Sequence, residues 1–493
     1  VITDNANNSP FYTSLNGNWE FNLAIKPDDR PYYFFKEDYD TSDWKSIKVP
    51  ANWELEGFDV PIYTNVKYPH EKTPPKIQDH YNPVGSYRTH FNIEDPDQGK
   101  EVFLHFGAVS SAMYVWVNGE KVGYSEGSKT PAEFNITKYL KKGSNLLAVE
   151  VYRWSDGSYL EDQDFWRLSG ITRDVYLLKR NKTYIKDFWS QADLDTSYKN
   201  GIFNVNIELE NKANNNYIIE TILLDSEKNE VYSASKNLES GKTTLEFEKT
   251  IPNVHLWNAE NPYLYNLIIQ LKTEDNTLLE SVGTEVGFRN VVIENGQLLV
   301  NGKAIYVKGV NLHEHHDRNG HYLDEETMIK DIKTMKMFNI NAVRTSHYPQ
   351  PELFYKLCNK YGLYLVDEAN IESHGMGATH QGTFDTIQHV AYRPEWNEAH
   401  LDRIKRFIER DKNHPSVIIW SMGNECGNGP VFFEVYEWIK NRDKTRLVLF
   451  EQAGLESNTD IVDPMYANIE TLEAYAKNFS DRPFILCEYA HAM

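Results

Sequence analysis

The stretch "VIIWSMGNE", residues 417–425, decides the fold class, because its apolar side chains follow one another without alternating with polar ones. A continuously apolar strand is typical of a parallel sheet that is buried on both faces by helices. Six further segments of this kind follow residue 290: "AIYVKGVNLH" (304–313), "NAVRTSHYP" (341–349), "LYLVDEANIE" (363–372), "RLVLFEQ" (446–452), "DIVDPMYA" (460–467) and "FILCEYAH" (484–491).

Amphipathic helices are predicted between most of these strands. One apolar stripe consists of Met328, Ile332 and Met335, and another of Leu401, Ile404, Phe407 and Ile408. Their spacing of three and four residues is helical. Seven strands that alternate with helices predict a TIM barrel lacking its eighth strand. An open barrel would leave about six apolar residues uncovered, worth roughly 12 kcal/mol, so we expect the natural protein to continue beyond Met493.

The residues before this region predict two β domains. In residues 1–182, apolar runs meet across Asn118-Gly119, which is a strong hairpin signal. The polar and aromatic segment "SDGSYLEDQDFWRLSG" (155–170) predicts a long loop, and loops of that length are often functional. In residues 183–288, short strands alternate cleanly, as in Phe203, Val205, Ile207 and Leu209, which predicts an immunoglobulin-like sandwich. Residues 289–493 form the barrel domain.

Composition narrows the possible partners. The chain has 493 residues, 40% of them hydrophobic, and therefore more than one core. Its net charge of −21 and the lack of a Lys/Arg block argue against nucleic acid or an anionic membrane as partner. No apolar stretch approaches the roughly 20 residues needed to span a bilayer. Three cysteines without paired spacing argue against a disulfide framework or a structural zinc site.

Reactive side chains occur at the ends of six predicted strands. Each alone could serve as a salt-bridge partner or loop anchor, but strand ends of a barrel meet on one rim. Glu425 and Glu488 each follow an apolar run, an environment that can make one carboxyl a proton donor while another stays ionised. Paired carboxyls across a pocket are typical of glycosidic bond cleavage. The residues are His313, His347, Glu372, Glu425, Tyr466, Glu488 and His491.

Glu372 and His374 form a second candidate pair. They lie two residues apart at a strand end, so both side chains can point to the same side of the backbone. Such a carboxylate-rich pair suits Mg²⁺ or Mn²⁺ better than zinc. An ordinary hydrogen-bonded pair remains the alternative.

Long motifs across the whole chain resemble glycoside hydrolase family 2, in its β-galactosidase branch. The motifs are "PIYTNVKYP", "RWSDGSYLEDQDFWRLSGITRDVYL", "NGKAIYVKGVNLHEHH", "RTSHYP", "DEANIESHGM", "WSMGNECGNG", "DPMYA" and "ILCEYAHAM". The resemblance implies a jelly-roll sugar-binding domain, an immunoglobulin-like domain and a catalytic barrel. It also implies a retaining double displacement of β-galactosides such as lactose.

The resemblance assigns a role to each site residue. Glu488 would be the nucleophile and Glu425 the acid/base, with Arg344 and Tyr466 supporting the nucleophile. Glu372, His374 and Glu425 would hold Mg²⁺, and Asp164 would contribute to a Na⁺ site. Galactose hydroxyls would be bound by Asn65, Asp164, His313, His347, Asn424 and His491. The full-length protein would be a homo-oligomer.

Three other functions remain open at this point. The first is another family 2 activity, β-glucuronidase or β-mannosidase, although no extra Lys or Arg beside the motifs suits a glucuronide. The second is a galactoside-binding fragment without turnover, and the third a metal-dependent hydrolase. Because residue 1 is valine, we expect a trimmed start, so no export signal can be read and cytoplasm and periplasm both remain open.

Overall fold

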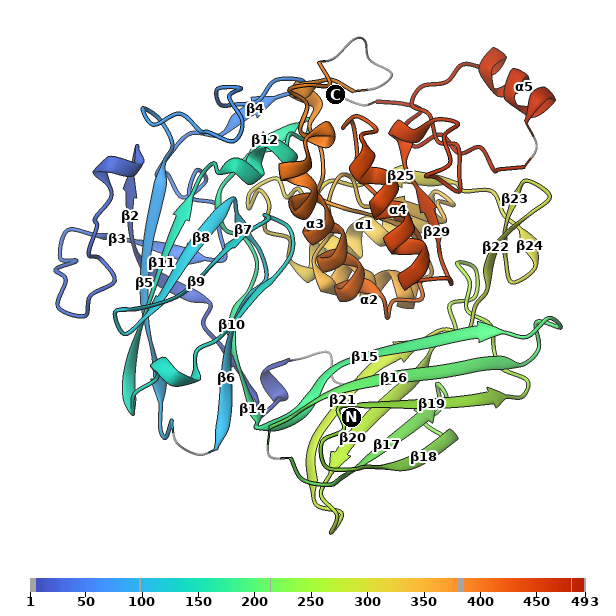
Figure 1. Ribbon diagram of the computed structural model, residues 1–493, viewed down its shortest axis with the longest axis horizontal. Coiled ribbons are helices and arrows are strands. Elements are labelled where there is room, and N and C mark those ends of the chain that lie inside the picture. The colour runs from blue at the N-terminus through green and yellow to red at the C-terminus, as the bar shows by residue number, and fades with distance from the viewer. Residues whose placement is uncertain (1–5, 97–98, 213, 379–384, 480, 492–493) are drawn as a thin grey trace.

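The computed structural model describes residues 6–96, 99–212, 214–378, 385–479 and 481–491. Three domains follow one another along the chain, two of them β-sandwiches and the third built from parallel strands and helices (Figure 1). The predicted multidomain β plus α/β class is therefore confirmed. In the described residues, no helix is long and apolar enough to cross a membrane.

The first domain packs two antiparallel sheets around one apolar core. The sheets run in the orders β1-β14-β6-β10 and β3-β2-β5-β11-β8-β9, and two short pairs, β12-β4 and β13-β7, lie beside them. The predicted hairpin is confirmed between β8 and β9, where Asn118 and Gly119 both have positive φ, as a two-residue turn requires. The strands are β1 (Tyr12–Ser14), β2 (Gly17–Ala24), β3 (Lys45–Val49), β4 (Ile62–Thr64), β5 (Val84–Ile93), β6 (Lys100–Phe106), β7 (Val109–Ser110), β8 (Ala112–Val117), β9 (Glu120–Glu126), β10 (Ala132–Asn135), β11 (Gly143–Tyr152), β12 (Phe165–Arg167), β13 (Gly170–Ile171) and β14 (Val175–Asn181).

The second domain is a β-sandwich, as predicted, and it has seven strands in the described residues. Its sheets run in the orders β15-β16-β19 and β18-β17-β20-β21. Phe203, Val205, Ile207 and Leu209 of β16 are all buried, as their alternation predicts. The strands are β15 (Thr183–Leu194), β16 (Gly201–Asn211), β17 (Tyr217–Leu224), β18 (Glu230–Leu238), β19 (Thr244–Ile251), β20 (Tyr265–Lys272) and β21 (Leu278–Val286).

The third domain begins with a small antiparallel sheet and continues as a parallel one. The small sheet consists of β22 (Val291–Glu294), β23 (Gln297–Val300) and β24 (Lys303–Ala304). The parallel sheet runs in chain order through β25 (Gly309–Asn311), β26 (Ala342–Arg344), β27 (Tyr364–Glu368), β28 (Val417–Ser421) and β29 (Leu447–Leu449). All five residues of β28 are buried, as the unbroken apolar run predicts. Burying each of its large side chains contributes about 1.5–3 kcal/mol.

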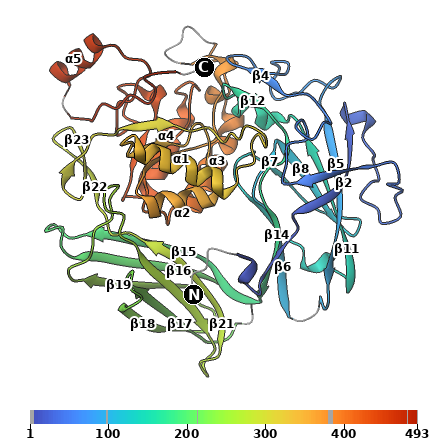
Figure 2. The ribbon, with the colours of Figure 1, turned by 180° about the vertical axis from the view of Figure 1, so that it is seen from behind.

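Helices cover the outside of this sheet, as both views show (Figures 1 and 2). The first predicted apolar stripe, Met328 to Met335, is the buried face of α1. The second is the inner face of α3, although Leu401 is only partly buried. These helices are α1 (Glu325–Met337), α2 (Glu352–Tyr361), α3 (Asn397–Asp411) and α4 (Pro430–Arg442). A fifth helix, α5 (Ile469–Asn478), lies apart from the sheet and has no buried residues (Figure 1).

Two of the seven predicted barrel strands do not form ladders. Residues 460–467 and 484–491 continue the sheet only through single bridges, such as Val462 to Phe484 and Met465 to Glu488. Pro464 and Pro483 have no backbone N–H to donate, and Tyr466 has a φ of 49°, so a regular ladder cannot form there. Side chains link the last segment to β25, since Asn311 Nδ2 donates to Cys487 O at 3.1 Å.

Candidate active site

A cavity of about 1080 Å³ runs along the parallel strands, from the small antiparallel sheet and the amino ends of β25 and β26 to the carboxyl ends of the strands. Ten of the twelve predicted site residues line it, and they come from the first domain as well as the barrel. The other two, Glu372 and Asn424, are buried: Asn424 accepts a hydrogen bond from Arg344, and a ligand atom of Glu372 lies within 4.8 Å of His374 and Glu425. The ten are Asn65, Asp164, His313, Arg344, His347, His374, Glu425, Tyr466, Glu488 and His491.

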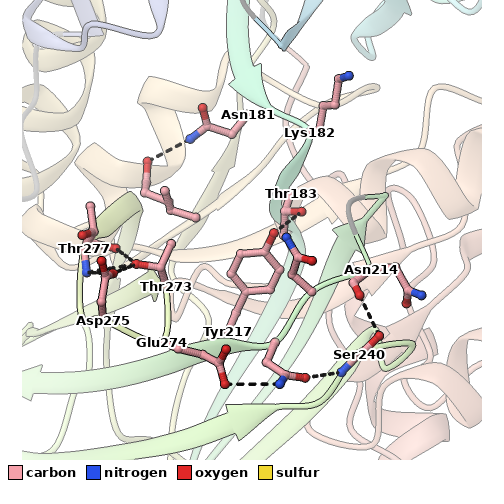
Figure 3. A pocket seen from close by; sticks show the side chains of 13 residues that line it. Asn181, Lys182, Thr183, Asn214, Tyr217, Ser240, Thr273, Glu274, Asp275 and Thr277 are labelled. Atoms are coloured by element: carbon pink, nitrogen blue, oxygen red, sulfur yellow. Dashed lines mark hydrogen bonds between the residues drawn. The ribbon is translucent and has the colours of Figure 1, made fainter.

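A second large cavity, of about 810 Å³, lies on the second domain (Figure 3). Amide and hydroxyl groups dominate its lining, and many of them bond one another. Tyr217 Oη donates to Thr183 Oγ1 at 3.0 Å, and Asn216 Nδ2 donates to Glu274 Oε1 at 3.2 Å. The predicted catalytic residues are not among the residues that line it, so the barrel cavity is the candidate active site.

Glu488 accepts hydrogen bonds on both carboxylate oxygens. Tyr466 Oη donates to Oε2 at 2.6 Å, and Arg344 Nη1 lies 3.4 Å from Oε1. The backbone fixes the first contact, because Tyr466 N also donates to Glu488 O at 2.7 Å. Burial and the Glu488 carboxylate raise the pKa of Tyr466, so its hydroxyl stays protonated and can donate. Both contacts hold the Glu488 carboxylate in a fixed orientation toward the cavity.

Arg344 is held in place by two further partners. Its Nε donates to Glu368 Oε2 and its Nη2 to Asn424 Oδ1, both at 2.8 Å. Burial disfavours the charge on Glu368, but Arg344 and His347 outweigh burial and lower the pKa of Glu368 to about 2. His347 Nδ1 lies 2.8 Å from Glu368 Oε1, and its Nε2 lies 3.8 Å from Glu488 Oε1. Glu368 therefore anchors two groups that face the same carboxylate.

Glu425 belongs to a cluster with Glu372 and His374. Ligand atoms of the three residues lie within 4.8 Å of one another, and His374 Nδ1 is 2.8 Å from Glu425 Oε2. Asn424 Nδ2 donates to Glu372 Oε2 at 3.1 Å, while Glu372 Oε1 is buried and accepts no hydrogen bond among the described residues. Burial and the charge of Glu425 raise the pKa of Glu372. A divalent cation could coordinate the buried Glu372 Oε1 and would balance the negative charges of Glu372 and Glu425. Two carboxylates with one imidazole fit Mg²⁺ or Mn²⁺.

The backbone around Glu425 explains how a strand end presents this carboxylate. Asn424 N donates to Ile371 O at 3.0 Å, which joins the ends of the third and fourth barrel strands. Gly423 makes this approach possible, because a Cβ there would lie 2.6 Å from Ile371 O. Glu425 itself has a φ of 28°, a conformation that non-glycine residues rarely adopt and that concentrates at functional sites.

The first domain completes the rim of the cavity. Its 155–170 segment bonds directly to the barrel, since Asp162 N donates to Glu372 O at 3.0 Å and Glu372 N to Leu160 O at 2.8 Å. Asp164 accepts a hydrogen bond from Tyr63 Oη. Phe165 stacks on His313 with ring centroids 4.3 Å apart. The predicted long loop therefore contributes to the candidate active site.

The predicted histidines differ in their surroundings. His313 Nδ1 lies 3.0 Å from Tyr348 Oη, and burial, followed by the neighbouring His347, lowers the pKa of His313, so its ring is neutral at pH 7. His491 Nδ1 lies 3.4 Å from Tyr466 Oη.

Three residues near the cavity escaped the sequence-based search. Glu368 lies inside the predicted strand 363–372, although it is the last residue of β27, and its signal was the acidic pair Asp367-Glu368 inside an apolar run. Glu451 lies near the end of the predicted strand 446–452, two residues after β29; it is buried, and burial raises its pKa to about 7. Tyr63 gave no signal, because its relation to Asp164 depends on the fold.

Models of glycosyl hydrolases family 2 match the chain in three consecutive parts. The sugar binding domain matches residues 12–181, a second model of the family residues 183–289, and the TIM barrel domain residues 291–493. Solved structures agree on the fold. A beta-glycosidase from Bacteroides vulgatus has a TM-score of 0.77 at 26% identity over 97% of this chain and 58% of that chain. A beta-glucuronidase from Bifidobacterium dentium has a TM-score of 0.81 at 22% identity over 98% of this chain and 84% of that chain.

Curated relatives are more similar in sequence. A beta-galactosidase of Priestia megaterium is 44% identical, with 100% of this chain and 49% of the relative covered. A beta-galactosidase of Vibrio cholerae is 43% identical, with 97% of this chain and 48% of the relative covered. The chain thus spans about half the length of these relatives. Because models of this one family match three consecutive domains that cover residues 12–181, 183–289 and 291–493, the chain belongs to glycosyl hydrolases family 2.

Proposed function

We propose that the protein of this chain is a retaining β-galactosidase that removes terminal β-D-galactose from β-galactosides such as lactose. One observation carries the proposal: Glu425 and Glu488 line the same cavity, and hydrogen bonds from Arg344 connect Glu488 to Asn424, the neighbour of Glu425. The curated relatives named beta-galactosidase support galactose as the sugar.

The reaction takes two displacements at the anomeric carbon. In the first, a carboxylate oxygen of Glu488 forms a bond to that carbon while its bond to the leaving oxygen breaks, and Glu425 gives its proton to the leaving oxygen. In the second, Glu425 takes a proton from water, the water oxygen bonds to the anomeric carbon, and the ester bond to Glu488 breaks. Two inversions retain the β configuration.

Arg344 and Tyr466 prepare Glu488 for attack. Burial disfavours the charge of Arg344, but Glu368 and Glu488 outweigh it and raise the pKa of Arg344, so the guanidinium stays positive. With Tyr466 it orients the Glu488 carboxylate for attack, as a nucleophile requires.

Polar groups around the rim bind the sugar hydroxyls. We assign this role to Asn65, Asp164, His313, His347, Asn424 and His491, and a Na⁺ site that includes Asp164 stays part of the proposal. The neutral ring of His313 can both donate and accept a hydrogen bond, which suits a neutral sugar.

Glu372, His374 and Glu425 would hold Mg²⁺. The buried Glu372 Oε1 without a hydrogen bond is the observation that supports this part of the proposal. When bound, the ion supplies positive charge beside the acid/base carboxyl. We expect a chelator to reduce turnover partially, because Glu488 lies outside the cluster. Complete loss of turnover that returns only with metal would instead favour a metal-dependent hydrolase.

Trapping of the covalent intermediate tests the proposal. A dinitrophenyl galactoside that carries fluorine beside the anomeric carbon should form a stable ester, and mass spectrometry of peptides should locate it on Glu488. Glu488→Gln keeps the shape of the side chain and should abolish labelling without unfolding the protein. Labelling of another residue, or inversion of configuration in the product, would contradict the assignment.

A panel of nitrophenyl glycosides separates the alternatives. Hydrolysis of the glucuronide or mannoside without the galactoside would reassign the activity within the family. Calorimetry with galactose identifies a fragment that binds sugar without turnover. Both measurements should be made on this chain and on any longer protein that contains it, which we propose to be a homo-oligomer.

A further inference from the structure

The two ring nitrogens of His313 have different surroundings. His313 lines the active-site cavity, whereas Tyr348 is buried and is not among the residues that line it. His313 Nδ1 lies 3.0 Å from Tyr348 Oη. In the part of the chain that the structure describes, His313 Nε2 forms no hydrogen bond with another residue. Nδ1 is therefore occupied by the protein, and Nε2 is the nitrogen that remains for a ligand in the cavity.

The Tyr348 hydroxyl determines which nitrogen of His313 carries the proton. Its oxygen accepts a hydrogen bond from Glu314 N at 3.2 Å, and its one proton needs an acceptor because Tyr348 is only 1% exposed. Among the described residues, His313 Nδ1 is the acceptor within reach. Burial raises the pKa of Tyr348 well above its usual value, so the hydroxyl keeps this proton. The proton of the neutral His313 ring therefore lies on Nε2.

Phe165 of β12 restricts the plane of the same imidazole ring. It stacks on His313 with ring centroids 4.3 Å apart and an interplanar angle of 13°. It also stacks on His321, with centroids 5.0 Å apart and an angle of 7°. Pairing with Thr64 of β4 holds the backbone of Phe165 in place. Because a stacked ring cannot turn without losing this contact, the first domain controls the direction in which His313 Nε2 points.

We propose that Tyr348 and Phe165 are positioning residues, which make His313 a hydrogen-bond donor, through Nε2–H, to one hydroxyl oxygen of the galactose ring. This inference rests on the proposed galactosidase activity. A neutral imidazole has one donor and one acceptor, and Tyr348 takes the acceptor. His313 therefore selects a group that accepts a hydrogen bond. His347 differs, because its Nδ1 lies 2.8 Å from the Glu368 carboxylate, which can only accept.

Nitrogen-15 NMR of protein labelled at histidine tests the position of the proton without any ligand. The signals of His313 are those that disappear in His313→Ala. In the wild-type protein we expect a proton on Nε2 and none on Nδ1. Tyr348→Phe removes the hydroxyl that Nδ1 accepts from, so the Nδ1 signal should shift and a fraction of the ring should carry its proton on Nδ1 instead. A proton on Nδ1 in the wild-type protein, or unchanged signals in Tyr348→Phe, would overturn the role of Tyr348.

Deoxygalactoses that each lack one hydroxyl group test the consequence for binding. Calorimetry gives the loss of affinity for each missing hydroxyl, and the hydroxyl that His313 contacts is the one whose loss disappears in His313→Ala. In the wild-type protein this loss should be about 3- to 10-fold, the range expected for one hydrogen bond. It should become smaller in Tyr348→Phe and in Phe165→Leu, whereas the losses for the other hydroxyls should stay the same.

Tyr217→Phe is the matched control. Tyr217 is also a buried tyrosine, and its hydroxyl donates to an uncharged partner, Thr183 Oγ1, at 3.0 Å on the second domain. The control should change neither the NMR signals of His313 nor the loss of affinity for any missing hydroxyl. If it changes them as Tyr348→Phe does, the effect is not specific to His313 and the proposal is wrong.

Each positioning residue is judged by its own variant. A variant of Tyr348 or Phe165 that keeps the full loss of affinity for the hydroxyl contacted by His313 would overturn the role of that residue. If Tyr348→Phe does not fold, the wild-type NMR signals decide the role of Tyr348. A wild-type protein that binds no galactose would overturn the proposed function and this role with it, whereas a proton on His313 Nδ1 would overturn this role alone.

Discussion

Glu425 and Glu488 face the same cavity but have different partners. Glu488 accepts hydrogen bonds from Tyr466 and Arg344, whereas His374 lies 2.8 Å from Glu425 in a cluster that also contains Glu372. The Tyr466 hydroxyl and the Arg344 guanidinium orient the Glu488 carboxylate, which suits a nucleophile. The difference in surroundings is the basis on which the two roles are assigned.

Glu425→Gln tests the role of proton donor. The amide cannot protonate the leaving oxygen, so we expect kcat/KM to fall by about 10²–10⁴-fold for lactose, whose leaving group is a poor one. The loss should be much smaller for dinitrophenyl galactoside, because its leaving group departs without a proton. Steady-state kinetics on both substrates measure this, and equal losses would exclude Glu425 as the acid.

Glu54 should make the stability of the first domain depend on pH. Arg153 lies 3.6 Å from it, yet burial dominates and raises its pKa to about 7. Below about pH 4.5 the folded and unfolded states both hold the proton, whereas between about pH 4.5 and 7 only the folded state does. Unfolding then releases a proton, so the free energy of unfolding should fall by up to about 3 kcal/mol as pH rises through this range.

Denaturant unfolding at about pH 5 and about pH 8 measures this dependence. Glu54→Gln imitates the protonated form, and its amide oxygen can still accept the 2.9 Å hydrogen bond from Ser169 N. In Glu54→Gln, the free energy of unfolding should therefore no longer show the fall with rising pH that is assigned to Glu54. An unchanged slope in the variant would show that Glu54 is ionised in the folded protein.

At the scale of elements, Gly423 determines how the ends of β27 and β28 meet. It has a φ of 144°, and a Cβ would clash with Ile371 O. Gly423→Ala should therefore destabilise the barrel by about 1–3 kcal/mol and reduce activity, since Asn424 and Glu425 follow directly.

Gly143→Ala is the matched control for this change. Gly143 also has a positive φ, of 88°, but nothing lies within 4 Å of its Cβ position. Its cost should be about 1 kcal/mol from backbone conformation alone, without loss of activity. Thermal unfolding and turnover of both variants separate the clash from the backbone effect. Similar costs for the two variants would contradict the steric explanation.

The sequence predicts elements well where one physical signal dominates. The apolar run of β28 and the alternating pattern of β16 each predict their strand and its burial. The segments at 460–467 and 484–491 were predicted as strands on the same apolar signal, but two prolines and the turn at Tyr466 limit them to single bridges. A local apolar pattern cannot show how many backbone partners a segment will find.

Some residues of the candidate site could be predicted from the sequence, and others could not. Strand-end residues such as Glu425 and His347 could be found because a barrel brings strand ends together. Glu368 could not, because its importance lies in contacts with Arg344 and His347 across neighbouring strands. Tyr63 is likewise defined by its contact with Asp164, which is 101 residues away in sequence.

Glu314 of the barrel joins its domain to the first one. Lys129 Nζ lies 2.7 Å and Arg173 Nε 2.9 Å from its two carboxylate oxygens, and all three residues are buried. Glu314→Gln would leave two buried cations without their counter-charge, so we expect a loss of about 3–5 kcal/mol.

An exposed ion pair provides the control for this prediction. Lys186 and Glu208 lie 2.6 Å apart on the second domain, and both are about half exposed. Glu208→Gln should cost at most about 1 kcal/mol, because water already screens the pair. Chemical denaturation of both variants gives the comparison. Equal losses of unfolding free energy in Glu314→Gln and Glu208→Gln would mean that other groups balance the charges of Lys129 and Arg173.

The hydrogen bonds that join Leu160 and Asp162 to Glu372 limit how the two domains can evolve. The first domain is hydrogen-bonded to the strand end that carries Glu372, a candidate ion ligand. Substitutions that move one domain therefore also move the other, so the two domains cannot evolve independently. A chimaera that grafts the sandwich of a relative onto this barrel would import that relative's rim together with its preference among substrates. New substrate specificities should then evolve through substitutions in the first domain, while the reacting residues of the barrel stay the same.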